Sequence, residues 1–180
     1  MPINLKVNRM NSSGTRLNKI GLGGGCHWCT EAVFQALKGV TKVEQGYIAS
    51  TGEAAALSEA VLLSYQPDII SLPTLIQIHL HTHESTSNHS FRDKYRSAIY
   101  YLKPEDETLA LKAVKTFQND FEAPIITSVL PFEKFEASRA SLHDYYFSDP
   151  DKPFCTRYIE PKIQLLLKRF RKSVDLQKFN

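Results

Sequence analysis

Three consecutive glycines, residues 23–25, constrain the fold of this chain more than any other feature of its sequence. They follow a short apolar stretch, residues 19–23, that is typical of a strand. After them, apolar residues recur at helical spacing from Trp28 to about Gly39. Glycine lets the backbone turn sharply and lets other groups approach it closely. The pattern therefore predicts a strand, a glycine turn and a helix whose first turn carries Cys26.

The remaining elements do not alternate strictly between strand and helix. Strands are expected at residues 40–48, 57–65, 96–102 and 124–130, and helices at residues 72–81, 104–117 and 161–170. Gly46 predicts a bulge or a close backbone approach within its strand. Residues 132–153 are expected to be irregular. This order favours an α+β fold over a doubly wound parallel sheet. We expect a flexible N-terminal arm at residues 1–17 and one catalytic domain at residues 18–180.

Composition excludes several classes of protein. The chain has 180 residues, of which 42% are hydrophobic and 23% charged, as in an ordinary soluble domain. Its net charge of +3 is too balanced to indicate a nucleic-acid partner. The sequence contains neither a bilayer-spanning apolar stretch nor the apolar core of a secretory signal. Three cysteines are too few for a disulfide framework, so we expect a cytoplasmic protein with reduced thiols.

Cys26 has the setting of a reactive thiol. A helix N-terminus offers unpaired N–H groups and partial positive charge, which favour the thiolate and lower the pKa of the cysteine. Cys29 lies three residues further, on the same helix face, so a disulfide between the two is possible. A metal-binding protein or a thiol redox sensor remains an alternative, in which the further ligands would be His79, His81, His83 and His89.

Several motifs together resemble one known family. The glycine turn continues as Gly25-Cys26-His27-Trp28-Cys29, which is similar to the signature Gly-Cys-Phe-Trp-Gly. Tyr95-Arg96-Ser97-Ala98-Ile99 is similar to Tyr-Arg-Ser-Ala-Ile. Other similar stretches follow in the same order, at residues 37–47, 59–67, 71–86, 125–135, 143–146 and 154–155. This collinear pattern covers residues 20–170 and resembles peptide methionine sulfoxide reductase A.

The resemblance implies a fold and a reaction. The fold would be a two-layer, ferredoxin-like sandwich in which helices pack on a mixed sheet. The Cys26 thiolate would attack the sulfur of a methionine S-sulfoxide, free or in proteins, and would become a sulfenic acid. A second thiol would then form a disulfide with it, and thioredoxin or a similar dithiol would reduce that disulfide. Such an enzyme repairs oxidised proteins, needs no cofactor or metal, and is expected to be a monomer.

The resemblance also assigns residues to this chemistry. Glu59 would be the acid that protonates the departing oxygen, and Tyr95 a phenolic donor. Trp28 would wall the pocket for the substrate methyl group. The stretch between Gly46 and Glu59 is shorter than in typical members and lacks a second tyrosine donor, so either Tyr47 or His27 would have to replace it.

Two cysteines compete for the second thiol role. Cys155 follows an aromatic residue at the place where relatives carry a resolving cysteine, in a loop expected to be mobile. Cys29 replaces the family glycine and is close to Cys26, but on a rigid helix. On this reasoning Cys155 is the expected resolving cysteine and Cys29 the alternative.

Overall fold

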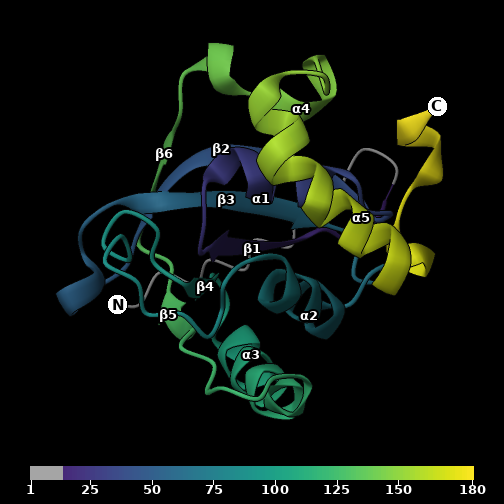
Figure 1. The fold of residues 1–180 in the computed structure, drawn as a ribbon. Helices are drawn as coiled ribbons and strands as arrows, with labels where there is room; N and C mark the ends of the chain where they lie inside the picture. The colour runs from purple at the N-terminus through teal and green to yellow at the C-terminus, as the bar shows by residue number, and fades with distance from the viewer. Residues whose placement is uncertain (1–13) are drawn as a thin grey trace.

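The computed structural model describes residues 14–180, with a six-stranded sheet at its centre (Figure 1). The strands lie in the order β5-β4-β1-β3-β2-β6, and all neighbours are antiparallel except β4 and β5. Their bounds are β1 (Asn18–Gly23), β2 (Val40–Ala49), β3 (Ser58–Tyr65), β4 (Ala98–Tyr101), β5 (Ser128–Pro131) and β6 (Lys134–Ala137).

Some helices pack on the sheet and others pack on a neighbouring helix. Figure 1 shows α1 lying against β3 with α4 and α5 beside it, while α3 packs on α2. Their bounds are α1 (His27–Gln35), α2 (Leu72–Thr82), α3 (Pro104–Phe117), α4 (Tyr145–Ser148) and α5 (Glu160–Arg169). The start of α2 is fixed by its own residues, because the Ser71 hydroxyl accepts the N–H of Thr74 and Pro73 lies in the first turn.

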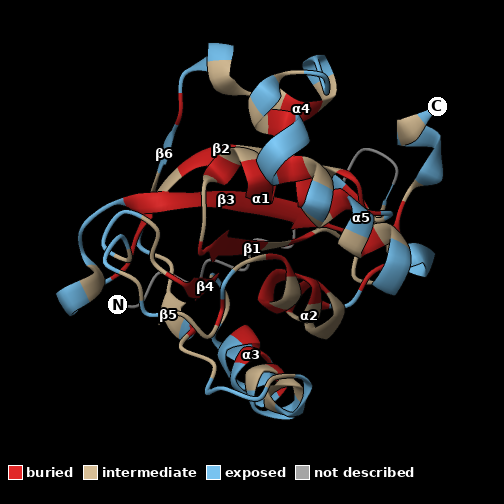
Figure 2. Ribbon diagram, viewed as in Figure 1, coloured by how far each residue is buried: buried red, intermediate tan, exposed pale blue. Residues whose placement is uncertain are grey.

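Alternation along the central strands decides which face meets the helices. Val61 and Leu63 of β3 pair with Leu22 and Ile20 of β1, and all four side chains are buried in the core that includes α1 and α2. Tyr100 belongs to a smaller cluster on the opposite face. Figure 2 shows that β3 is buried along its whole length. Glu59, two residues before Val61, therefore faces the helix layer.

The predicted fold class is confirmed. The succession β1-α1-β2-β3-α2-β4, with β4-β1-β3-β2 as neighbours in space, is the ferredoxin-like arrangement. Among residues 14–180 no helix combines the length and the apolar character needed to cross a bilayer. Of the expected N-terminal arm, residues 1–13 lie outside the described residues, and β1 begins at Asn18.

Three local predictions need correction. Residues 134–137 form strand β6 at the edge of the sheet, where an irregular segment was expected. The strand expected at residues 124–130 is β5, which covers only Ser128–Pro131. Cys155–Ile159, expected as a loop, is a π-helical segment that leads into α5. Short 3-10 segments occur at Gly52–Ala54, Gln118–Asp120, Ala140–Leu142, Arg171–Ser173 and Leu176–Phe179.

Candidate active site

Cys26 stands at the boundary between the glycine turn and α1. It is the N-cap residue of this helix, and its carbonyl oxygen accepts the N–H groups of Cys29 and Thr30. The pKa of the half-buried Cys26 thiol is lowered, chiefly because the Cys29 thiol donates a hydrogen bond to its sulfur. Burial opposes this shift, and the backbone N–H groups of Trp28 and Cys29 support it. The expected thiolate-favouring helix start is therefore present, with Cys29 as its strongest contributor.

Cys29 is the cysteine whose side chain interacts most strongly with that of Cys26. It is buried, and its pKa is raised because it donates to the Cys26 sulfur and because it is removed from water. A raised pKa keeps the Cys29 proton in place while Cys26 is ionised. The pair thus consists of one thiol with a lowered pKa and one thiol with a raised pKa.

Glu59 lies directly in front of the helix start. Its side chain is only 9% exposed, and its Oε2 accepts the backbone N–H of His27 at 3.1 Å. The negative charge of Glu59 opposes the lowering of the Cys26 pKa, and its bond to the N–H of the next residue brings the carboxyl group to the same helix start as the sulfur. The predicted acid and the predicted nucleophile are therefore neighbours.

Tyr47 and His27 lie on the same side of the sheet as Glu59. Tyr47 on β2 pairs directly with Glu59 on β3, so both side chains leave the sheet in one direction. The His27 ring is 4% exposed, contacts the Tyr47 ring edge-on at 5.3 Å, and makes a 3.0 Å hydrogen bond to the Gly46 carbonyl through Nδ1. Both candidates for the missing phenolic donor thus stand beside the acid.

The loop before β4 brings Lys94 and the neighbouring Tyr95 to Glu59. Its backbone is pinned there, because the Lys94 carbonyl oxygen accepts the N–H of Glu59. Lys94 Nζ lies 3.7 Å from Glu59 Oε1 and 5.0 Å above the half-buried Tyr95 ring. The pKa of Lys94 is raised, first by a hydrogen bond with the Tyr95 side chain. Tyr95 and a cation therefore flank the carboxyl group together.

Trp28 contributes an aromatic wall that is already partly occupied. The Tyr145 ring stacks on the indole at 4.2 Å and 2°, and Phe154 meets it edge-on at 5.2 Å. Trp28 Nε1 is buried and has no hydrogen-bond partner among residues 14–180. One face of the indole is therefore covered by the segment after β6. The expected pocket for the substrate methyl group would have to use the part of the Trp28 ring that Tyr145 does not cover.

The glycine turn is held by histidines that the sequence offered as metal ligands. A Cβ on Gly24 would lie 2.4 Å from the His83 ring, whose Nε2 is bonded to Ser97. His79 Nε2 is bonded to the Gly23 carbonyl at 2.8 Å, and burial lowers the pKa of His79 to about 4. Residues 14–180 contain no group of three or more His, Cys, Asp or Glu side chains that could hold a metal ion. These rings support the turn instead.

The expectation for the surroundings of Cys155 is wrong. This cysteine opens the π-helical segment, and its side chain is fully buried at 0% exposure, so it does not lie in an exposed, mobile loop. Burial raises the pKa of its thiol. The charge that Cys155 would carry when ionised also contributes to the raised pKa of Cys29. The hydrogen bond to the Cys26 sulfur nevertheless comes from Cys29.

Three contributors escaped the sequence reasoning. For Lys94, the only signal in the sequence is its position next to Tyr95. Arg92 donates to the carbonyl oxygens of Gly24 and Tyr95, and so ties the glycine turn to the Tyr95 loop. Tyr145 lies in one of the resembling stretches, but nothing in the local pattern predicts that it stacks on Trp28.

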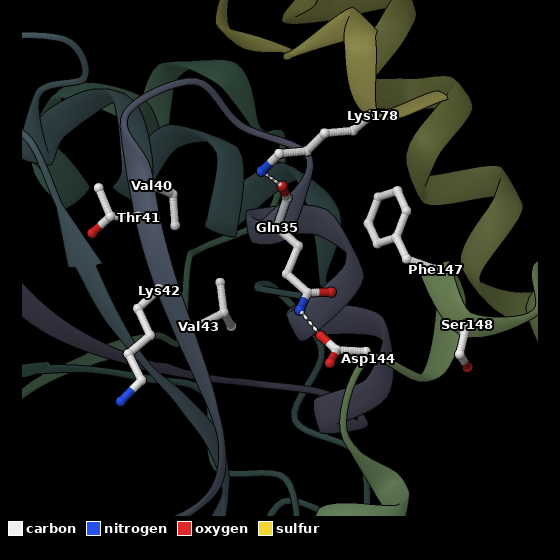
Figure 3. A pocket seen from close by; sticks show the side chains of 9 residues that line it. All are labelled: Gln35, Val40, Thr41, Lys42, Val43, Asp144, Phe147, Ser148 and Lys178. Atoms are coloured by element: carbon white, nitrogen blue, oxygen red, sulfur yellow. Dashed lines mark hydrogen bonds between the residues drawn. The ribbon is translucent and has the colours of Figure 1, made fainter. Parts of the chain in front are cut away.

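A separate cavity lies away from these groups. It has a volume of about 690 Å³ and opens between the end of α1, the start of β2 and α4 (Figure 3). Gln35 crosses it and donates to Asp144 at 2.6 Å, and Lys178 donates to the Gln35 carbonyl oxygen. Its lining residues are Gln35, Val40, Thr41, Lys42, Val43, Asp144, Phe147, Ser148 and Lys178. None of the candidate catalytic residues belongs to it.

Comparison with known proteins gives a consistent result. The family model described as "Peptide methionine sulfoxide reductase" matches residues 18–174. The chain is 32% identical over 174 residues to a protein of Sulfolobus acidocaldarius named peptide methionine sulfoxide reductase MsrA, covering 87% of this chain and 97% of that one.

Solved structures share the fold. Mxr1 from Saccharomyces cerevisiae in its reduced form has a TM-score of 0.68 at 20% identity, covering 83% of this chain and 94% of that one. Mxr1 has also been solved in complex with Trx2, with a TM-score of 0.58 at 21% identity and coverage of 74% and 88%. On this fold, the residues matched by the family model, 18–174, extend from β1 to the residues after α5.

Proposed function

This chain belongs to the peptide methionine sulfoxide reductase family, and we propose that Cys26 is the nucleophile with which it reduces methionine sulfoxide to methionine. One observation carries this assignment: the thiol with the lowered pKa stands at the start of α1 with the buried Glu59 in front of it. A thiolate beside a buried proton donor is the pair of groups that sulfoxide reduction needs.

In the first step the Cys26 thiolate attacks the substrate sulfur. The sulfoxide oxygen takes one proton and passes to Cys26 as a hydroxyl group, so that thiolate, sulfoxide and proton give a sulfenic acid and methionine. The methionine sulfur gains two electrons and the cysteine sulfur loses two. The reaction therefore needs a proton at the oxygen and donors that stabilise the charge developing there.

Glu59 is proposed as the source of that proton, with Tyr95 as a second donor to the oxygen. The burial of Glu59 and its hydrogen bond to the first N–H of α1 support the assignment, because they hold the carboxyl group beside Cys26. Tyr47, His27 and Trp28 are proposed to line the substrate site. Their placement around Glu59 and Cys26 supports this role.

Cys29 is proposed to resolve the sulfenic acid first. Its thiol hydrogen and the Cys26 hydroxyl group leave as water, and a Cys26–Cys29 disulfide forms. The hydrogen bond from Cys29 to Cys26 supports this order over direct attack by the fully buried Cys155. Cys155 is assigned a later exchange with Cys29, for which the π-helical segment has to open. Mass spectrometry after a single turnover without reductant should find the Cys26–Cys29 disulfide; a Cys26–Cys155 disulfide at that stage would contradict the order.

The remaining finer assignments are also proposals. Thioredoxin or a similar dithiol protein would reduce the disulfide, in line with the complex of Mxr1 with Trx2. The substrate would be the S epimer of methionine sulfoxide, free or in proteins. The protein would act as a monomer in the cytoplasm, to which the free state of all three cysteines is suited.

The test is the reduction of separated R and S epimers with dithiothreitol and, in parallel, with a thioredoxin system. We expect turnover of the S epimer only, and none in Cys26→Ser at matched thermal stability. Lack of S-epimer turnover with both reductants would contradict the proposed activity, whereas turnover with dithiothreitol alone would exclude thioredoxin as the partner.

A further inference from the structure

His27 has a fixed tautomer in this structure. Its Nδ1 lies 3.0 Å from the carbonyl oxygen of Gly46, in a hydrogen bond shielded from water. A carbonyl oxygen carries no hydrogen, so Nδ1 must donate. In the neutral ring the lone pair is therefore on Nε2. The 4% exposure of His27 leaves this nitrogen little access to water as an alternative partner.

The lone-pair nitrogen faces the acid of the active site. His27 Nε2 lies 3.8 Å from Glu59 Oε2, the same oxygen that accepts the His27 backbone N–H. One residue thus approaches one carboxylate oxygen through both its backbone and its ring. At 3.8 Å the two atoms lie outside hydrogen-bond range, and a proton can pass between them only when the ring and the carboxylate approach each other.

The other charged or titratable neighbours do not offer Glu59 an equivalent base. Tyr47 from β2 presents its ring edge to His27, and Cys26 is the nucleophile itself. Lys94 lies 3.7 Å from Glu59 Oε1. The pKa of Lys94 is raised, so this side chain keeps its proton and acts as a fixed positive charge. His27 is therefore the neighbour that can both store and release a proton.

We propose that His27 and Glu59 hold one proton between them, and that His27 is a positioning residue which keeps this proton available to Glu59 for the sulfoxide oxygen. This inference rests on the proposed function. The resemblance places phenylalanine at position 27 in other members, and this chain lacks the second tyrosine donor, so the imidazole adds a proton store where a phenolic donor is missing.

The step balances. Before attack, the pair carries one proton, either on Glu59 or on His27 Nε2. As Cys26 attacks, Glu59 passes the proton to the departing oxygen, and any proton on Nε2 moves to Glu59. The products are the Cys26 sulfenic acid, methionine, neutral His27 and the Glu59 carboxylate. Solvent restores the single proton before the next turnover, while condensation with Cys29 releases water and needs no further proton.

The first test compares the pH dependence of kcat for methionine S-sulfoxide in wild type, His27→Phe and His27→Asn. Phenylalanine fills the ring volume without nitrogen. Asparagine places a donor where Nδ1 stands and so keeps a bond to Gly46, but it has no group at the position of Nε2. Both variants should lose activity at lower pH than wild type, so that the ratio of kcat at pH 8 to kcat at pH 6 is about tenfold lower than in wild type, whatever the loss common to all pH values.

Thermal unfolding and the alkylation rate of Cys26 serve as controls for folding and nucleophile. A wild-type alkaline limb in His27→Asn would show that only the bond to Gly46 matters and would overturn the proposal. A parallel drop of kcat at all pH values in both variants would do the same.

A second measurement does not depend on turnover, and so separates this inference from the proposed function. Nitrogen-15 NMR of the ring, assigned with His27→Asn, should show Nδ1 protonated by its bond to Gly46. In Glu59→Gln, where the carboxylate facing Nε2 is gone, the Nε2 chemical shift should differ from that of wild type. An unchanged Nε2 chemical shift in Glu59→Gln would refute the shared proton even if the protein proved inactive.

Discussion

The backbone N–H of His27, the first residue of α1, donates to Glu59 Oε2 on β3 across 3.1 Å. This bond joins the start of the helix that carries the nucleophile to the strand that carries the acid. His27 and Glu59 are 32 residues apart in the chain, and the bond fixes one oxygen of the proposed acid against the helix start without involving the Cys26 sulfur. Because the acid is held by backbone, its orientation does not depend on the side chain at position 27.

Glu59→Gln should separate the reactivity of Cys26 from catalysis. Glutamine keeps an oxygen for the His27 N–H but removes the negative charge that raises the pKa of Cys26. The pKa of Cys26 should fall further, and iodoacetamide should alkylate it at lower pH than in wild type. Turnover should fall about 100-fold or more, because the proton donor is lost. Unchanged turnover, measured at saturating S-sulfoxide, would remove Glu59 from the mechanism.

Cys29 has two separable functions that a pair of variants can distinguish. Cys29→Ala removes the hydrogen bond that lowers the pKa of Cys26, so the alkylation profile should move to higher pH. Cys29→Ser keeps a donor and should move the profile less. Both variants should release about one methionine per protein in the absence of reductant but fail in the thioredoxin-coupled assay. Full coupled turnover in Cys29→Ser would assign the resolving function to Cys155.

The neighbouring glycines before Cys26 offer a matched comparison. In Gly24→Ala the new Cβ would lie 2.4 Å from the His83 ring, at a φ of +155° that residues with a side chain rarely adopt, while in Gly25→Ala it meets nothing within 4 Å. Overpacking of this kind costs about 1–3 kcal/mol, which in a chain of this size lowers the melting temperature by roughly 2–10 °C. Differential scanning calorimetry should show that loss for Gly24→Ala only. Equal melting temperatures for the two variants would mean that His83 does not fix the turn.

Acid should destabilise the protein through His79. Burial lowers its pKa from 6.5 to about 4, so the unfolded chain binds more protons than the folded one between these values. Stability from this residue is present above about pH 6.5 and is lost as the pH falls toward 4, by up to about 3 kcal/mol. Urea midpoints measured from pH 7 to pH 4.5 should fall accordingly. The slope should be shallower in His79→Gln and unchanged in His89→Gln.

Sequence reasoning recovered the parts of the fold that have local causes. The helix after the glycine turn and the strand with alternating Val61, Leu63 and Tyr65 can be predicted from residues close together in the sequence. Both are present in the structure. Strand β6 escaped because it is an edge strand of only four residues, Lys134–Ala137, and the alternation of Phe135 and Ala137 with two charged residues is too short to predict a strand. Its place follows from pairing with β2, which local pattern does not contain. The predicted close approach at Gly46 comes from this same pairing, since a Cβ there would lie 2.1 Å from the Glu136 carbonyl oxygen.

In the candidate site, too, single residues can be recognised from the local sequence, whereas their arrangement cannot. Cys26 is recognisable from its turn and helix, and Glu59 and Tyr95 from the motifs around them. The geometry that makes them work together comes from register and loop closure. The pairing of Tyr47 with Glu59, the position of Lys94 and the covering of Trp28 by Tyr145 all join segments distant in sequence. The setting of Cys155 was mistaken because its burial depends on packing in the segment that leads into α5.

Trp28 is the single tryptophan of the chain, and it stands between Cys26 and Cys29 under the ring of Tyr145. Its intrinsic fluorescence therefore reports on one place only. A disulfide between the two flanking cysteines is an efficient quencher at contact distance, and loss of the Tyr145 ring would expose the indole to water and shift its emission to longer wavelength. Stopped-flow emission can thus time cysteine oxidation and release of the Tyr145 segment separately, without any added label.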